Sequence, residues 1–297
     1  MLRAAHPGLD CHTLLFDTQG DRSLDTPLPN IGGKGVFTAE LERALLAGDI
    51  DIAVHSLKDL PTEATPGLTL GAITARADVR DVLIAPAAAS LDALPRGAIV
   101  GTSSHRRAAQ LLALRPDLAI KPIRGNVETR IQKVQDGQYD AAVLAMAGVA
   151  RLGLESNISA IFTLDEILPA PGQAALAVQC RAADATTLAL LREVDDLAAR
   201  IATEAERSFL AGLGGGCSAP VAAYASIRGN AGGNESGLKQ TEIVIEMSSL
   251  VASLDGSNIV RVQGSGDDAE ALGRSLARQA REQGADELLA AARIATG

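Results

Sequence analysis

A cysteine follows a run of glycines in the segment GGGCSAP, residues 214–220. Because glycine has no Cβ, it adopts backbone conformations closed to other residues and leaves a neighbouring side chain uncovered. The thiol of Cys217 is therefore placed to reach an electrophile. The alternative is that Cys217 is a small buried apolar residue in a turn. The spacing alone leaves both interpretations open.

A lysine and an aspartate follow a short apolar strand predicted at residues 51–55. Ligands of open α/β sheets bind at the carboxyl ends of the strands. Lys58 and Asp59 are therefore candidates for holding a polar ligand and stabilising a cation, although a solvated Lys–Asp pair in a loop is the alternative. Ser56 and His55 are candidates for orienting them, and a structural histidine with satisfied hydrogen bonds is the simpler explanation of His55.

Two segments place arginines at the start of a predicted helix: GTSSHRR at residues 101–107 and RGNVETR at residues 124–130. Backbone N–H groups, hydroxyls and guanidinium groups that converge at a helix start bind anions. Thr102, Ser103 or Ser104 would cap the first helix and Asn126 the second. Each segment alone is also explained by such a cap and a solvated face, but two on successive strand–helix turns favour a ligand with several carboxylates or phosphates. The candidates are Thr102, Ser103, Ser104, Arg106, Arg107, Arg124 and Arg130.

The segment IGGKG, residues 31–35, lacks the spacing of a nucleotide-binding phosphate loop. Lys34 is more simply a cation offered to a carboxylate from a loop. The four histidines and three cysteines show no metal-ligand spacing, so we expect no metal.

Composition narrows the class of protein. The net charge of −9 and the aromatic content of 2% argue against nucleic-acid binding, which needs a basic surface and stacking platforms. Any anionic ligand must then be held by local arginine clusters. Three separated cysteines fit a reducing compartment, and neither a membrane span nor a secretory signal is recognised, so we expect a cytoplasmic protein.

Strands alternate with helices between residues 51 and 179, which predicts parallel, open α/β sheets. A long helix at residues 196–210 and several strands indicate a small α+β domain at the end of the chain, with a hairpin at Asp255-Gly256. The first residues are typical of a helix end. Predicted strands lie at 13–16, 98–100, 119–123, 141–145, 174–179, 221–225, 242–248 and 258–263, predicted helices at 35–47 and from 268, and a loop at 228–237.

The chain resembles the porphobilinogen deaminases, also called hydroxymethylbilane synthases, over nearly its whole length. The segments that carry the resemblance are GGKGVFTAELERALLAGDIDIAVHSLKDLPTE from Gly32, GTSSHRRAAQL from Gly101, RGNVETR from Arg124, DAAVLAMAGVARLGL from Asp140, LPAPGQAALAVQCR from Leu168 and AERSFLAGLGGGCSAP from Ala205.

This resemblance implies an α/β fold with two lobes like those of type II periplasmic binding proteins and a small α+β C-terminal domain. Domain 1 would comprise residues 1–75 and 173–193, domain 2 residues 79–168, and domain 3 residues 196–297. The lobes would be joined by crossovers near residues 75–79 and 168–172.

The resemblance also implies the reaction. Cys217 would carry a dipyrromethane cofactor through a thioether. Porphobilinogen units would be added one at a time, each losing ammonia to give an azafulvene electrophile that the terminal pyrrole attacks. After four additions, water would release hydroxymethylbilane. The chain would then be a transferase of porphyrin, tetrapyrrole and haem biosynthesis, monomeric, with no nucleic-acid or membrane partner.

Residue roles follow from the matching motifs. Asp59 matches the catalytic aspartate of the family, which would hold pyrrole N–H groups, stabilise developing positive charge and move protons. The acetate and propionate groups of the pyrroles would pair with cations and helix-start amides. Lys34, Arg151 and Gln173 would bind substrate, and Ser56, Lys58, Thr102, Ser103, Ser104, Arg106, Arg107, Arg124 and Arg130 would bind the cofactor.

The sequence departs from the family pattern at its start. Family members begin with a strand and helix that supply an Arg and a Ser to the active site, and roughly two dozen such residues are not matched here. Three single positions also differ: Gln19, Asn30 and Ala174, the last in place of the second glycine of Pro-Gly-Gln-Gly-Ala. The alternatives to an active deaminase are an inactive, truncated member of the family and a non-catalytic carboxylate-binding protein of the same fold.

Overall fold

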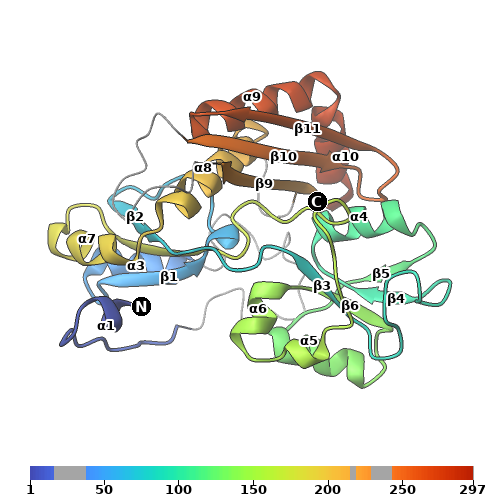
Figure 1. Ribbon diagram of the computed structural model, residues 1–297, viewed down its shortest axis with the longest axis horizontal. Helices are drawn as coiled ribbons and strands as arrows, with labels where there is room; N and C mark the ends of the chain where they lie inside the picture. The colour runs from blue at the N-terminus through green and yellow to red at the C-terminus, as the bar shows by residue number, and fades with distance from the viewer. Residues whose placement is uncertain (17–37, 215–218, 229–242, 297) are drawn as a thin grey trace.

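The computed structural model describes residues 1–16, 38–214, 219–228 and 243–296 of the 297-residue chain. These residues form two α/β lobes and a third body at the C-terminal end, each built on its own sheet (Figure 1). Two segments, residues 74–80 and 167–175, cross between the lobes, close to the crossovers expected at 75–79 and 168–172. The fold class is therefore α/β with a small α+β C-terminal body, as expected.

The first lobe has a three-stranded sheet in which both pairings are antiparallel. The middle strand belongs to the returning half of the chain, and for this reason the parallel sheet expected from strand–helix alternation is not found here. Its strands, in order, are β1 (Ile52–Ser56), β8 (Leu176–Arg181) and β2 (Leu68–Ile73). Its helices are α1 (Leu2–Ala5), α3 (Ala39–Ala47) and α7 (Ala185–Leu191).

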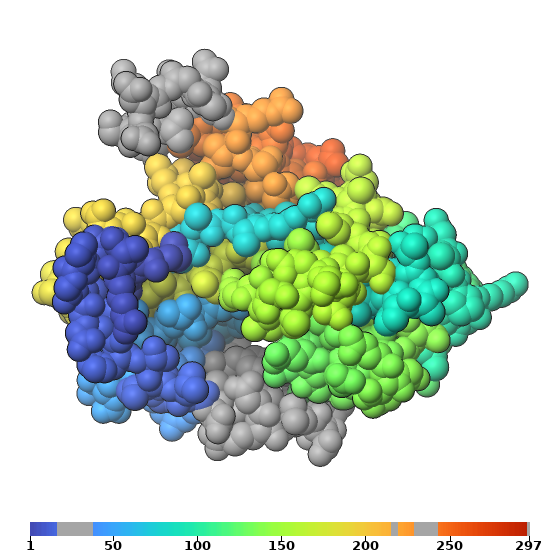
Figure 2. Space-filling view, turned by 60° about the horizontal axis from the view of Figure 1, so that its bottom comes forward, coloured from blue at the N-terminus to red at the C-terminus, as the bar shows by residue number. Residues whose placement is uncertain are grey.

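The start of the chain lies against this lobe, where Leu2 packs on the core and the His6 ring contacts the carbonyl of Leu190 at 2.9 Å (Figure 2). The short helix α1 confirms the expected helix end. The strand expected at residues 13–16 is not formed, and Leu15 is 94% exposed. A strand needs a neighbour for its N–H and C=O groups, and no described strand pairs with this segment.

The second lobe has a five-stranded mixed sheet. Its central strands run parallel, as expected, while the strand that enters from the first crossover is antiparallel to both neighbours. The strands, in order, are β5 (Ala119–Lys121), β4 (Ile99–Gly101), β6 (Ala141–Ala145), β3 (Asp81–Ile84) and β7 (Ala160–Ile161). The helices are α4 (His105–Leu114), α5 (Val127–Gln135) and α6 (Met146–Arg151).

The C-terminal body is an antiparallel sheet covered on one face by helices (Figure 1). The hairpin signal at Asp255-Gly256 is confirmed, since it joins the last two strands. Helices α8 and α9 pack closely because glycines, including Gly273, let the two backbones approach. The elements are α8 (Leu197–Gly212), β9 (Val221–Arg228), β10 (Val244–Ala252), β11 (Ile259–Gly266), α9 (Ala269–Glu282) and α10 (Ala285–Thr296).

Ala174 lies in the second crossover with a left-handed backbone, φ +71°, and it is the one described non-glycine residue with a positive φ. This conformation costs a residue with a Cβ about 1–2 kcal/mol, while the freedom of glycine in the unfolded chain offsets about 0.4–1 kcal/mol. We therefore expect Ala174→Gly to raise the free energy of unfolding by about 0.5–1 kcal/mol. Urea denaturation measures this change. The buried neighbour Ala175 is the control, because Ala175→Gly should lower stability; an equal loss in both variants would contradict the strain.

Candidate functional site

A short 3₁₀ turn at the end of β1 carries the lysine and aspartate singled out from the sequence. The turn, η2 (Leu57–Asp59), follows β1 directly. Leu57 and Leu60 are buried in the lobe core, so the two residues between them are the ones that point away from it. Asp59 is exposed and Lys58 is half-buried. The pattern Leu-Lys-Asp-Leu thus presents a cation and a carboxylate from a fixed turn.

The first arginine segment forms the turn between β4 and α4. Ser104 is the N-cap of α4, and its side chain accepts from the N–H of Arg107, which confirms the expected cap. The N–H of Ser104 donates to the Thr102 hydroxyl at 3.1 Å. The Ser103 hydroxyl donates to the carbonyl of Ile123 at 2.9 Å and accepts from its N–H at 3.2 Å. These hydroxyls therefore shape the turn and tie it to the one after β5.

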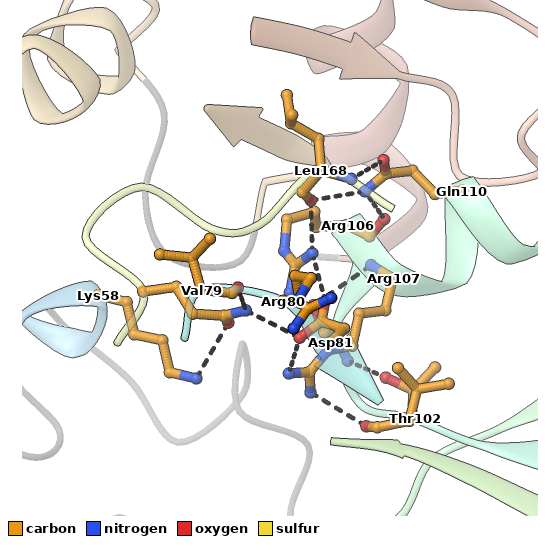
Figure 3. Close-up of polar contacts among 12 residues, drawn as sticks. Lys58, Val79, Arg80, Asp81, Thr102, Arg106, Arg107, Gln110 and Leu168 are labelled. Carbon is orange, nitrogen blue, oxygen red and sulfur yellow. Dashed lines mark hydrogen bonds and ion pairs between the residues drawn. The ribbon is translucent and has the colours of Figure 1, made fainter. Parts of the chain in front are cut away.

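Arg106 and Arg107 are buried, 4% and 6% exposed, and both pair with Asp81 at the start of β3. Their guanidinium groups approach its two carboxylate oxygens at 2.8 and 2.7 Å (Figure 3). Burial acts to raise the pKa of Asp81, but the charges of the two arginines outweigh it and hold that pKa well below its ordinary value. Asp81 is not among the site residues predicted from the sequence.

The second arginine segment caps and lines the start of α5. Asn126 is the N-cap, accepting from the N–H of Thr129 at 2.8 Å, as expected. Arg130 folds back so that its Nε donates to the carbonyl of Gly125 at 2.7 Å. Burial lowers the pKa of Arg130 to about 10, with the positive charges of Arg107 and Arg124 adding to the effect.

Charges from the two lobes act on one another. Asp59 of the first lobe raises the pKa of Arg130 in the second, against the lowering effects of burial and neighbouring arginines. Burial lowers the pKa of Lys58 to about 8; Arg107 and Arg106 also lower it, while Asp59 and Asp81 raise it. We call this set the interlobe charge cluster: Lys58, Asp59, Asp81, Arg106, Arg107, Arg124 and Arg130.

Gln173 lies at the centre of these contacts and is fully buried. Its amide nitrogen donates to the carbonyl of Val79 at 2.7 Å and to Asp81 at 2.9 Å. Its amide oxygen accepts from Lys58 at 3.4 Å. The sequence resemblance assigned Gln173 to substrate binding; here its side chain joins the crossovers to both lobes.

The remaining candidates are dispersed. His55 is buried against Gln179 at 3.2 Å, and burial lowers its pKa, which fits the structural interpretation. Ser56 is half-buried at the end of β1, and Arg151 is exposed at the end of α6. Lys34 and Cys217 lie outside the described residues.

Among the described residues, no group of three or more His, Cys, Asp or Glu side chains is placed to hold a metal ion. No helix in the described part of the chain is long and apolar enough to cross a membrane. A cavity of about 700 Å³ lies apart from the charge cluster, behind η2 and against α8 and α9.

The interlobe charge cluster suits a ligand with several carboxylates. It contains more cations than carboxylates, and the Nε–H of Arg107 is buried without a hydrogen-bond acceptor among the described residues. A ligand carboxylate would satisfy such a donor and form charge-assisted hydrogen bonds. Asp59, in the same cluster and exposed, is placed to hold N–H donors or a developing positive charge.

Two family models match the chain. Residues 1–189 match "Porphobilinogen deaminase, dipyromethane cofactor binding domain", and residues 201–282 match "Porphobilinogen deaminase, C-terminal domain". A porphobilinogen deaminase from Roseiflexus sp. is 48% identical over 97% of this chain and 91% of its own length. One from Brevibacillus brevis is 46% identical over 97% of this chain and 90% of its own.

Solved structures show weaker likenesses. A nutrient binding protein from Burkholderia cenocepacia bound to methionine has a TM-score of 0.38 at 18% identity, over 52% of this chain and 74% of that one. A periplasmic substrate-binding protein from Coxiella burnetii has a TM-score of 0.36 at 16% identity, over 53% and 76%. These scores are too low to carry an argument.

Proposed function

The chain belongs to the porphobilinogen deaminase family, and from this we propose how its residues perform the reaction. The protein is a transferase that condenses four porphobilinogen molecules, with loss of ammonia, into hydroxymethylbilane for porphyrin biosynthesis. Its cofactor is dipyrromethane. The observation that carries the proposal is the interlobe charge cluster, in which one exposed aspartate lies among five cationic side chains.

We assign the binding of the pyrrole carboxylates to the cationic side chains. Lys58 would act from the first lobe and Arg107, Arg124 and Arg130 from the second, with Arg106 held through Asp81. The bound dipyrromethane supplies the pyrrole carbon to which each new unit is joined. Arg151 and Lys34 are proposed to bind incoming substrate, and Ser56 and the 102–104 turn to line the site.

We assign to Asp59 the negative charge that stabilises the positive charge formed on the substrate during the reaction. As ammonia leaves, positive charge spreads over the pyrrole ring and its N–H group. A fixed carboxylate stabilises that charge without solvent reorganisation and can accept the proton that the ring later loses.

The stoichiometry of ammonia release tests the overall reaction. The purified protein should release one ammonia for each porphobilinogen consumed, and consumption without ammonia would refute the proposed reaction.

Lys58 gives the proposal a pH dependence. Its pKa of about 8 reflects burial first, then the arginines of α4, opposed by Asp59 and Asp81. Below that pH it is charged and can pair with a carboxylate; above it the charge is lost. We therefore expect KM for porphobilinogen to rise as pH increases through 8. Lys58→Arg, which stays charged, should flatten this rise, and an identical KM profile in the variant would contradict the assignment.

Two further features stay predictions. They are the domain bounds at residues 1–75 with 173–193, 79–168 and 196–297, and the monomeric state without nucleic-acid or membrane partners. None of the chemistry assigned above depends on them.

A further inference from the structure

Arg207, on α8 of the C-terminal body, reaches across to the back of the turn that carries Asp59. Its Nη1 donates to the carbonyls of Leu60 at 3.0 Å and Leu57 at 3.4 Å, and its Nη2 donates to that of Pro61 at 2.6 Å. Arg207 is not among the site residues predicted from the sequence, since its acceptors are backbone carbonyls about 150 residues earlier in the chain.

These carbonyls belong to the residue before the Lys58–Asp59 pair and the two residues after it. The carbonyl of Leu57 also accepts from the N–H of Leu60 at 3.2 Å, which closes the turn, whereas Leu60 and Pro61 follow the last residue of η2. A buried carbonyl that loses a donor is unfavourable. Leu57 and Leu60 are buried on this side of the turn. The planar guanidinium group offers several donors in a fixed fork, so a single side chain holds the turn at both ends.

Helix α8 is itself held firmly. The neighbouring Glu206 is fully buried and accepts from Arg76 at 2.6 and 3.0 Å, from the N–H of Gly172 at 2.7 Å and from the N–H of Ala225 at 2.8 Å. Those donors lie on both crossovers and on β9. Arg207 therefore extends from a helix fixed to the crossovers, and the same helix leads towards residue 217.

We propose that Arg207 is a positioning residue, which holds the turn so that Asp59 keeps its place among the cations of the second lobe. The inference rests on the proposed function of Asp59. Arg207 would not touch substrate. Its guanidinium group contacts the turn on the side of the 700 Å³ cavity, which Arg207 and Leu57 line and which Lys58 and Asp59 do not.

The test measures turnover in Arg207→Ala and Arg207→Lys, normalised to the covalently loaded fraction found by intact mass. Because misplacement of a catalytic group by about 1 Å costs up to about 100-fold, we expect kcat to fall about 10- to 100-fold in Arg207→Ala, with KM within about twofold. Lysine keeps the positive charge but has a single donor group. The kcat of Arg207→Lys should therefore lie between those of Arg207→Ala and the parent protein.

The cavity permits chemical rescue. Because it borders Arg207, millimolar guanidinium should enter and restore part of the kcat of Arg207→Ala. Arg274→Ala is the matched control: Arg274 lines the same cavity but pairs with Glu270 on its own helix, and kcat should be unchanged. If Arg207→Ala does not load cofactor, the kcat of loaded Arg207→Lys, below that of the parent, carries the test.

The outcomes separate the inference from the function on which it rests. A near-normal kcat in loaded Arg207→Ala, or in loaded Arg207→Lys where Arg207→Ala does not load, would overturn the positioning role. If kcat of Asp59→Asn is strongly lowered in the same assay, the role of Asp59 stays as assigned. A low kcat in Arg207→Ala that guanidinium does not raise would overturn the positioning role, because it would mean that the substitution disturbs the structure beyond the turn. Near-normal turnover in Asp59→Asn would overturn the proposed function itself.

Discussion

Asp59→Asn is expected to lower kcat by about 10²–10³-fold while the chain folds and binds porphobilinogen with a similar KM. The substitution keeps the shape of the side chain and removes its charge. Loss of one preorganised group that acts on developing charge has an effect of this size. Because Asp59 is exposed and its turn is anchored by Leu57 and Leu60, the folded state should change little. Single-turnover assays with saturating porphobilinogen measure the effect directly.

The control for Asp59→Asn is Glu63→Gln, which removes an exposed carboxylate four residues further along the chain. Its kcat should stay within about twofold of the parent, because the substitution leaves the carboxylate of Asp59 in place and an exposed charge is screened by solvent and salt. Equal losses in the two variants would mean that net charge matters and not the place of Asp59. Near-normal turnover in Asp59→Asn would refute the catalytic role assigned to Asp59.

The turns at the ends of strands were predictable because their signals are local. Ser104, one of the three residues at which a cap was expected, caps α4, and Asn126 caps α5 as expected. Lys58-Asp59 follows a strand of the expected length. In each case the deciding hydrogen bond or buried side chain lies within a few residues. Local spacing therefore carried the correct answer for these parts of the site.

The internal partners of the arginines were not predictable, because they are distant in sequence. Asp81 meets Arg106 and Arg107 some 25 residues later, and neither segment alone reveals the pairing. The antiparallel course of β8 depends in the same way on the chain returning through the second crossover. Arginines that looked equally available in the sequence therefore differ in the fold: Arg106 and Arg107 are buried against Asp81, while Arg130 is half-buried beside its own helix start.

Cys217→Ser is expected to abolish cofactor attachment and, with it, all turnover. A serine hydroxyl at this position is far less nucleophilic than a thiolate, so the thioether would not form. Intact-mass measurement should show the parent chain heavier by two linked pyrrole units and the variant at its sequence mass. Cys217 lies outside the described residues; the last described residue before it, Gly214, is held where its carbonyl accepts from Arg293 at 2.9 Å.

The matched control for Cys217→Ser is Cys11→Ser, because Cys11 is a partly exposed free thiol far along the chain from residue 217. Its mass increment should persist. Equal loading of Cys217→Ser would assign attachment to another side chain, and loss of loading in Cys11→Ser would move it to the first lobe. An increment lost only in Cys217→Ser would assign the covalent site to Cys217, which follows α8 in the sequence. The contact that Arg207 makes would then join the turn that carries Asp59 to the helix that precedes the attachment residue in the chain.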